Sequence, residues 1–413
     1  MLANYFKIAI AVLKRRKFFT FISLFGISLT LTILILMAAF FDHLFRAGYP
    51  DTKRDRSLYI IDKLILERED GGSMNGPPSF YFLEHYVSKL ETPSKVSISS
   101  AFRQTYSYVN NSKISIIYKY TNDQYWEVLE YEFVEGKPYS KQQIDNGERV
   151  AVISEDARDK YFGSEQQVVG KFIEADNVQY RVIGVVKDVP ITLPHVYSEI
   201  YLPYTVEKTD VRVNKTLIGN YMGILLADSK DDVEQMKTEY LEMASRIPMP
   251  GKEYKNLYTF ADSYFVAYMR DIFGQGQDSG LGTFYIVLSL VVSLFLLLPT
   301  LNLININITR IMERSSEIGI RKAFGASSKT LVMQFIVENM ILTFLGGIIG
   351  VALSIILISI FNNAEVIPHA QLGVNVEVLF YTVLACLVFG FISGVYPAWR
   401  MSRMQVVSAL NAS

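Results

Sequence analysis

Long apolar stretches without charged side chains set the main pattern of this sequence. Four such stretches cover residues 18–41, 279–309, 339–364 and 378–399. A helix needs roughly 20 apolar residues to cross a bilayer, and a charged residue at its centre costs roughly 2.5–3.5 kcal/mol. We therefore predict four transmembrane helices, at residues 18–41, 279–309, 329–361 and 377–399.

The first apolar stretch has a basic flank, Lys14 to Lys17, as secretory signal peptides do. The apolar core of a signal peptide is about 7–15 residues long, however, and this stretch is longer. No small-residue cleavage site follows it. We interpret it as an uncleaved anchor.

Basic residues outside the apolar stretches predict the orientation of the chain. Cytoplasmic loops carry an excess of Lys and Arg. The basic clusters precede the first helix, separate the second from the third and follow the fourth, whereas residues 362–375 contain neither Lys nor Arg. Both termini are then cytoplasmic and a large domain is extracytoplasmic. The remaining predicted segments are an interfacial helix (1–17), the outer domain (42–278), a cytoplasmic loop (310–328), a short outer loop (362–376) and a cytoplasmic tail (400–413).

The cytoplasmic loop between the second and third helices has the pattern of a short amphipathic helix. Glu317 and Arg321 are spaced for an ion pair along a helix, and Ile320 and Phe324 share an apolar face. Gly325 fits a helix stop, and Ser327 fits the N-cap of the next helix. Such a helix can dock into a groove on a cytoplasmic partner, although a solvated loop fits the same residues.

Several residues inside the apolar stretches have small or polar side chains. The pairs Gly346 with Gly350 and Gly390 with Gly394 permit close approach of helices, either within one chain or between two. Pro299 interrupts the second stretch. Asn302, Asn305 and Asn307 are expected to bond to neighbouring helices or to lie at the cytoplasmic end. Glu338 is expected near the cytoplasmic interface rather than in a proton relay.

The predicted outer domain has a mixed α/β pattern. We expect strands at 57–66 and 149–154, a helix at 155–162 and another at 231–246. Residues 171–186 predict a hairpin turning at Asp176 and Asn177. Residues 71–78 resemble a turn-rich loop, and 274–282 a glycine-rich hinge.

Composition excludes several classes of function. The 40 basic and 41 acidic side chains are nearly balanced, so the composition gives no reason to expect the basic surface that binds nucleic acid. The single cysteine, Cys386, excludes disulfides within the chain and cysteine metal clusters. The four histidines show no metal-ligand spacing, and no catalytic motif is present. We therefore expect no enzymatic activity, no metal and no cofactor on this chain.

Five segments of the chain resemble the MacB/FtsX-type permeases of ABC transporters. They are EIGIRKAFGA at 317–326, YPAWRMSRMQVVSAL at 396–410, FVEGKPYS at 133–140, VAVISE at 150–155 and YRVIGVVKD at 180–188. The first two are similar to membrane-domain motifs and the others to the periplasmic core domain. The order of one helix, a large domain and three helices is also similar.

The resemblance implies a permease in the bacterial inner membrane that forms a homo- or heterodimer. No phosphate-binding glycine loop occurs and about 17 residues precede the first helix, so we expect ATP and Mg²⁺ on a separate ATPase. A periplasmic adaptor and an outer-membrane duct are further possible partners. The residues implied in coupling to the ATPase are Glu313, Arg314, Glu317, Ile318, Gly319, Ile320, Arg321, Lys322, Phe324 and Gly325.

Two functions remain open at this point. One is export of a drug, peptide or lipid-linked cargo, with motion passed from the ATPase to the outer domain. The other is regulation of a cell-wall hydrolase by an FtsX-like subunit. Release of lipoproteins from the membrane is a further alternative, intermediate between these two functions. The large outer domain favours export.

Overall fold

The computed structural model describes residues 10, 15, 17–61, 63–109, 112–163, 165–313, 320, 324 and 327–402. The chain divides into two compact units, which are described separately. The helical unit consists of Met1–His43, Ile286–Val366 and Gln371–Ser413. The outer unit consists of Leu44–Tyr285 together with the short segment Ile367–Ala370.

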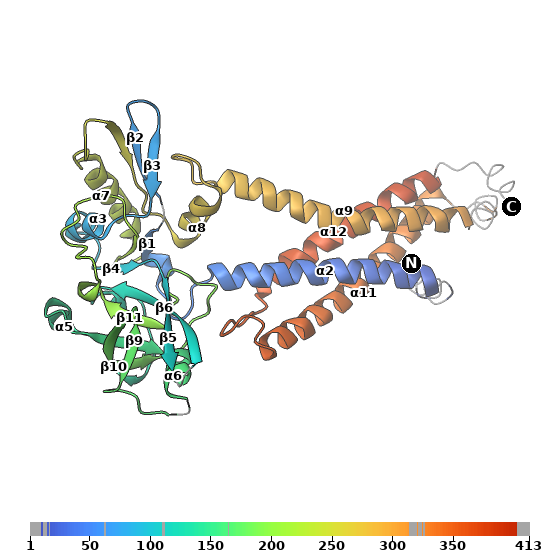
Figure 1. Cartoon of the computed structure of the whole chain (residues 1–413). Helices are drawn as coiled ribbons and strands as arrows, with labels where there is room; N and C mark the ends of the chain where they lie inside the picture. The colour runs from blue at the N-terminus through green and yellow to red at the C-terminus, as the bar shows by residue number, and fades with distance from the viewer. Residues whose placement is uncertain are drawn as a thin grey trace. The chain divides into compact units, whose positions relative to one another are not determined.

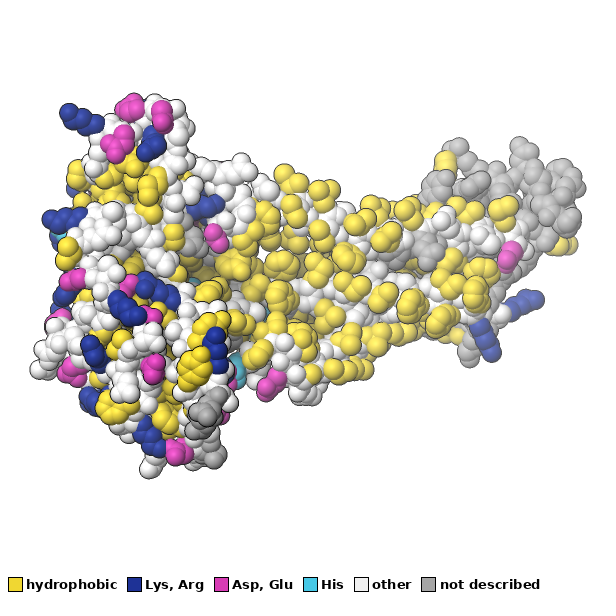
Figure 2. Space-filling model, viewed as in Figure 1, with side chains coloured by type: hydrophobic (Ala, Val, Ile, Leu, Met, Phe, Trp, Pro, Cys, Tyr) yellow, Lys and Arg dark blue, Asp and Glu magenta, His cyan; other side chains and the backbone are white. Residues whose placement is uncertain are grey.

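Four long helices form the described part of the helical unit (Figure 1). They are α2 (Lys17–Phe45), α9 (Leu281–Glu313), α11 (Ser328–Asn363) and α12 (Val376–Ser402). Each contains a stretch long and apolar enough to cross a membrane, which confirms the four predicted spans. Hydrophobic side chains cover the visible face of these helices, as lipid contact requires (Figure 2). The predicted interfacial helix lies almost wholly outside the described residues.

Local sequence signals account for the ends of these helices. The Ser327 hydroxyl accepts a hydrogen bond from the Thr330 amide, so it is the predicted N-cap of α11. The Asn375 side chain accepts from the Glu377 amide at 2.9 Å at the start of α12 and donates to Asp42 at 2.9 Å. Helix α9 continues past Pro299, and α12 continues past Pro397.

A mixed sheet of ten strands forms the larger part of the outer unit among the described residues. Its main path runs β1-β12-β4-β6-β11-β8-β10-β7, with β5 paired to β6 and β9 to β10. The pairs β8/β10 and β6/β11 are parallel, and the others are antiparallel. The strands are β1 (Ser57–Ile60), β4 (Lys95–Ser100), β5 (Arg103–Val109), β6 (Ser112–Thr121), β7 (Phe133–Gly136), β8 (Val150–Ser154), β9 (Phe172–Ala175), β10 (Val178–Val186), β11 (Ile200–Pro203) and β12 (Tyr221–Leu226).

A second, three-stranded sheet has the order β13-β2-β3. Its strands are β2 (Leu64–Arg68), β3 (Ser73–Gly76) and β13 (Tyr254–Tyr258). The helices of the outer unit are α3 (Phe80–His85), α4 (Tyr125–Val128), α5 (Lys141–Asp145), α6 (Glu155–Phe162), α7 (Val233–Ser245) and α8 (Tyr264–Phe273). The outer unit is therefore a mixed α/β domain between the first and second membrane helices, as predicted.

The predicted hairpin is confirmed by the pairing of β9 with β10. Asp176 and Asn177 form its turn with φ of 54° and 59°, values that Asn and Asp adopt more readily than most residues. Strand β8 and helices α6 and α7 also match the predicted elements.

Two predictions for the outer domain are wrong. Residues 57–66 form two strands in different sheets, because β1 pairs with β12 whereas β2 pairs with β13 and β3. Residues 71–78 are not only a loop, since Ser73–Gly76 pairs with β2 as strand β3. The first error arises from partners that are distant in the sequence, whereas β3 pairs with the neighbouring strand β2 across a short turn.

Candidate functional site

The predicted ATPase-coupling segment lies mostly outside the described residues. Arg314, Glu317, Ile318, Gly319, Arg321, Lys322 and Gly325 are among those not described. Of the others, Glu313, Ile320 and Phe324 are exposed, and the Phe324 amide donates to the Ile320 carbonyl at 3.0 Å, as in one helical turn. The Phe324 side chain is 89% exposed, which leaves a large apolar surface in a loop predicted to be cytoplasmic.

The first glycine pair lies where α11 approaches α2. A Cβ atom on Gly346 would lie 2.8 Å from Ile27 Cγ2, and one on Gly350 would lie 2.9 Å from the Ser28 carbonyl oxygen. The Thr32 hydroxyl also donates to the Gly350 carbonyl at 3.1 Å. Small residues here let the two backbones come close within one chain.

The second glycine pair lies where α12 approaches α11. A Cβ atom on Gly390 would lie 2.3 Å from Thr343 Oγ1, and one on Gly394 would lie 2.9 Å from Asn339 Nδ2. Asn339 donates to the Gly390 carbonyl at 2.5 Å and to Ser393 Oγ at 2.9 Å. Its own oxygen accepts from Asn307 Nδ2 at 3.1 Å. One buried amide thus connects α9, α11 and α12, and the polar groups of these asparagines are used within the unit.

Glu338 precedes this amide and is also buried, with 1% of its surface exposed. It lies among the described helices, and its place near the cytoplasmic interface stays a prediction. Of the predicted asparagines, Asn307 bonds to another helix, whereas Asn305 is exposed. The side chain of Asn302 is not described.

The chain enters the outer unit from α2 through residues 44–53, which we call the first connector. A buried arginine, Arg54, holds it. Its guanidinium donates to the carbonyls of Leu44 at 3.1 Å and Arg46 at 3.0 Å, and to Asp51 Oδ2 at 2.9 Å. The guanidinium carbon also lies 3.8 Å from the centre of the Tyr264 ring, in a cation–π contact.

The Asp51 carboxylate forms hydrogen bonds with several buried side chains. His195 Nε2 lies 3.0 Å from Asp51 Oδ2, and the Tyr59 hydroxyl lies 2.9 Å from each carboxylate oxygen. Burial favours the neutral form of Asp51, but the hydrogen bond from His195 and the charge of Arg54 outweigh it and keep the pKa of Asp51 below its usual value. Burial lowers the pKa of His195, against the opposing effect of Asp51. We therefore treat the Asp51–His195 contact as a carboxylate accepting from a neutral imidazole.

A buried lysine lies next to this cluster. Lys119 Nζ donates to the carbonyls of Pro194 at 3.1 Å and His195 at 2.7 Å. Burial lowers the pKa of Lys119 to about 7, since no carboxylate compensates for the lost hydration.

The chain leaves the outer unit for α9 through residues 274–280, the second connector. Here Arg270 is the buried arginine. It donates to Asp262 Oδ2 at 2.8 Å and to the Gln277 carbonyl at 2.9 Å, and it lies 3.7 Å from the centre of the Phe260 ring. Lys63 Nζ donates to the carbonyls of Arg270 and Gly274 at the end of α8. The glycine-rich segment predicted as a hinge is thus bonded to the outer unit at several points.

Two aromatic residues join the two connectors. The backbone of Tyr59 exchanges hydrogen bonds with that of Asp262, at 2.7 and 3.1 Å, while its hydroxyl bonds to Asp51. The Phe265 ring on α8 lies 4.9 Å from the Phe45 ring at the end of α2 and 5.5 Å from the Phe284 ring in the first turn of α9. Phe45 and Phe284 therefore both contact Phe265 within the outer unit.

The sequence analysis did not identify this junction of the two connectors. Its charged residues are 3 to 219 positions apart in pairs, and none belongs to a known motif. The available signal was weak: Arg54 and Arg270 flank the first and second apolar stretches on the outer side, where the positive-inside rule disfavours basic residues.

Comparisons with known proteins match most of the chain. Residues 20–240 match the family model of the MacB-like periplasmic core domain, and residues 289–406 match that of the FtsX-like permease C-terminal region. The first model covers both α2 and most of the outer unit. The second covers α9, α11 and α12.

Several curated proteins are similar in sequence. The macrolide export ATP-binding/permease protein MacB of Mannheimia succiniciproducens is 26% identical over 329 residues, which is 78% of this chain and 48% of the relative. That of Burkholderia cenocepacia is 29% identical over 70% of this chain and 40% of the relative. The pyoverdine export ATP-binding/permease protein PvdT of Pseudomonas syringae is 25% identical over 69% of this chain and 41% of the relative. The chain spans about half the length of these relatives or less.

Two solved structures are similar to part of the chain. One is the periplasmic region of MacB from Actinobacillus actinomycetemcomitans, with 15% identity and a TM-score of 0.37 over 52% of this chain and 92% of that chain. The other is the extracellular domain of the transporter YknZ from Gram-positive bacteria, with 19% identity and a TM-score of 0.34 over 48% of this chain and 99% of that chain.

Proposed function

Because the chain belongs to the family with a MacB-like periplasmic core domain and an FtsX-like permease region, we propose that it is the permease subunit of an ATP-driven export machine. In this proposal a separate ABC ATPase supplies the motion, and α2 and α9 carry it to the outer unit. The outer unit then expels a substrate on the far side of the bacterial inner membrane. Both termini are cytoplasmic.

The observation that carries this proposal is the way the two connectors are held. Helices α2 and α9 each continue without interruption from residues of the helical unit into residues of the outer unit. Each connector is then fixed by a buried arginine that pairs with a buried aspartate. Removing one partner of a buried ion pair is costly, so these contacts resist bending at the places where force must pass.

The substrate is proposed to avoid a path through the helices of this chain. In the described part of the helical unit, Asn307, Asn339 and Ser393 bond to one another. A polar pathway would instead need such groups to face a water-filled cavity. We propose that the cargo is a drug-like molecule, a peptide or a lipid-linked compound, a choice that the export functions in the relatives' names support.

The ATPase is proposed to dock on the segment around Glu313, Ile320 and Phe324, and two permease protomers to work together. Exposed apolar side chains next to charged ones suit a helix that enters a groove on a partner. A periplasmic adaptor and an outer-membrane duct are proposed as further partners.

Co-purification in detergent with the ATPase encoded nearest to this chain tests the proposal. We expect the ATPase to be retained by the native chain and lost when residues 313–322 are scrambled. A permease with Arg246→Glu, an exposed substitution in the outer unit, is the control and should retain the ATPase. If no ATPase binds the native chain, the proposal is wrong, and recovery of a cell-wall hydrolase with the chain instead would favour the regulatory function.

A further inference from the structure

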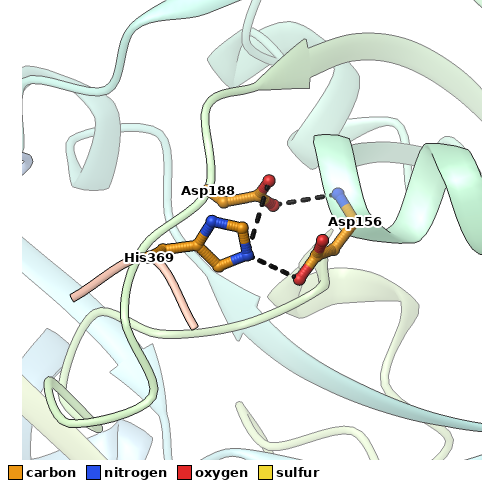
Figure 3. Close-up of side chains that lie close together, drawn as sticks. All are labelled: Asp156, Asp188 and His369. Carbon is orange, nitrogen blue, oxygen red and sulfur yellow. Dashed lines mark hydrogen bonds and ion pairs between the residues drawn. The ribbon is translucent and has the colours of Figure 1, made fainter. Parts of the chain in front are cut away.

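The short segment Ile367–Ala370 belongs to the outer unit, although it lies in the chain between α11 and α12. Within that unit His369 meets two aspartates from separate elements. Asp156 lies in the first turn of α6, and Asp188 follows β10. Figure 3 shows the three side chains pointing toward one another.

Each of the three residues offers one ligand atom, and these atoms lie within 4.8 Å of one another. His369 Nε2 is 2.9 Å from Asp156 Oδ2 and 3.8 Å from Asp188 Oδ2. Neighbouring ligand atoms around a cation with bonds of about 2.1 Å lie roughly 3.0 Å apart in an octahedral site and roughly 3.4 Å apart in a tetrahedral one. The two histidine–carboxylate separations bracket these values, and all three atoms lie near enough for side-chain adjustment to bring them to one ion.

The backbone already orients one ligand. Asp188 Oδ1 accepts a hydrogen bond from the Asp156 amide at 2.9 Å, which leaves Oδ2 directed at His369. Second contacts of this kind fix ligand side chains in metal sites. The backbone of the helix that carries Asp156 thus also orients the Asp188 side chain, so the two carboxylates are positioned together.

The charge of the cluster is not balanced by basic side chains. Among the described residues neither Asp156 nor Asp188 forms an ion pair with Lys or Arg, and nearby Lys187 and Arg158 pair with Glu132, Glu155 and Asp159. A protonated His369 would supply one positive charge against two carboxylates. A divalent cation would match them.

We propose that Asp156, Asp188 and His369 form a binding site for a divalent transition-metal cation of the Zn²⁺ class. One imidazole nitrogen and two carboxylate oxygens suit Zn²⁺ better than Mg²⁺ or Ca²⁺, which prefer oxygen ligands alone. All three residues are partly exposed, so water can reach the remaining coordination positions. The bound ion would join the segment Ile367–Ala370 to α6 and to the end of β10.

Calorimetric titration of the full-length chain with ZnCl₂ tests this site. The chain is purified in detergent with a tag that contains no histidine, and its metal is removed with EDTA. We expect one Zn²⁺ per chain, with affinity at least tenfold weaker in His369→Ala and in Asp188→Asn. His85→Ala removes another exposed outer histidine, and Asp159→Asn alters an exposed aspartate on the same helix; both should bind as the native chain does.

A second measurement keeps the test decisive if a variant is unstable. Co²⁺ in place of Zn²⁺ should give visible absorption bands with the native chain. The more conservative Asp188→Asn variant should lose these bands. In EDTA this variant should still melt at nearly the native temperature, which shows that it is folded. Absence of Zn²⁺ binding to the native chain would overturn the proposal. Equal binding by native and His369→Ala chains would overturn it too, because the contact would then be an ion pair only.

Discussion

Arg54 and Arg270 hold the two connectors of the outer unit in the same way. Each is buried, pairs with a buried aspartate at 2.9 or 2.8 Å, stacks on an aromatic ring and donates to connector carbonyls. Tyr59 joins the two sites, since it contacts Asp51 through its hydroxyl and Asp262 through its backbone. A displacement of either helix end would therefore act on both sites.

Replacing Arg54 with alanine should destabilise the outer unit by about 3–5 kcal/mol, because Asp51 would remain buried without its cationic partner. Trp126 lies in the outer core, so its fluorescence in a Trp399→Phe background reports the unfolding of this unit in urea. Arg246→Ala removes an exposed pair with Glu242 and should change the free energy of unfolding by less than about 1 kcal/mol. Equal effects of the two substitutions would contradict the assigned role of Arg54.

Stability should fall between pH 7 and pH 5 because of His195. Its pKa is lowered in the folded chain, so over this range the unfolded chain takes up a proton that the folded chain does not. The slope contributed is at most about 1.4 kcal/mol per pH unit. Asp51 contributes only at lower pH, since its folded pKa is below its usual value. The His195→Gln variant should show a shallower loss of melting temperature over this interval; an unchanged slope would indicate that His195 is charged in the fold.

Because of Lys119, the free energy of unfolding should rise from pH 7 to pH 10. Its pKa is about 7 in the fold against a usual value of 10.5, so between these values the unfolded chain binds the extra proton. Raising the pH then stabilises the fold by up to about 1.4 kcal/mol per unit. Lys119→Met should flatten this rise, whereas exposed Lys230→Met should leave it intact. Melting temperatures across the interval check both variants.

Adding one methyl group at the contact of α11 with α2 should weaken the helical unit. A Cβ atom at Gly350 would lie 2.9 Å from a carbonyl oxygen, whereas one at Gly347 would have its nearest neighbour at 3.9 Å. We expect Gly350→Ala to cost about 1–3 kcal/mol and Gly347→Ala to be nearly neutral. Thermal unfolding in detergent, followed by helix circular dichroism, distinguishes the two. Similar melting of both variants would contradict close packing at Gly350.

Reversing the charge at Arg321 should uncouple the permease from the ATPase. Arg321→Glu removes the predicted pair with Glu317 and places an acid in the docking segment. Membrane insertion should be unchanged, while stimulation of ATP hydrolysis by the permease should be lost. Arg246→Glu, in the outer unit, is the control. Full stimulation of ATP hydrolysis by the Arg321→Glu chain would contradict the assignment of the coupling segment.

The sequence predicts the membrane part of the fold better than the outer unit. Length and the absence of charge are enough to find a membrane helix, and Ser327 and Asp176-Asn177 act through neighbours in the chain. The split of residues 57–66 between two sheets depends on strands β12 and β13, which lie far away in the sequence. Local patterns contain no information about such partners.

The candidate sites were missed for a similar reason. Arg54, Asp51 and His195 come together only after the outer unit folds, and their spacing follows no motif. His369 shows no ligand spacing with another histidine, because its partners are the aspartates Asp156 and Asp188. The resemblance to a family predicts a coupling segment, but it gives no indication of these buried contacts.

In the proposed function, ATP-driven motion of the ATPase reaches the outer unit. The most direct test measures the distance between spin labels at Lys230→Cys in the two protomers, in a Cys386→Ala background reconstituted with the ATPase. Lys230 is exposed in the outer unit, and Cys386 is the chain's only cysteine. We expect a distance distribution that changes when ATP is trapped, and no change in the Arg321→Glu chain. Identical distributions with and without trapped ATP in the native complex would contradict it.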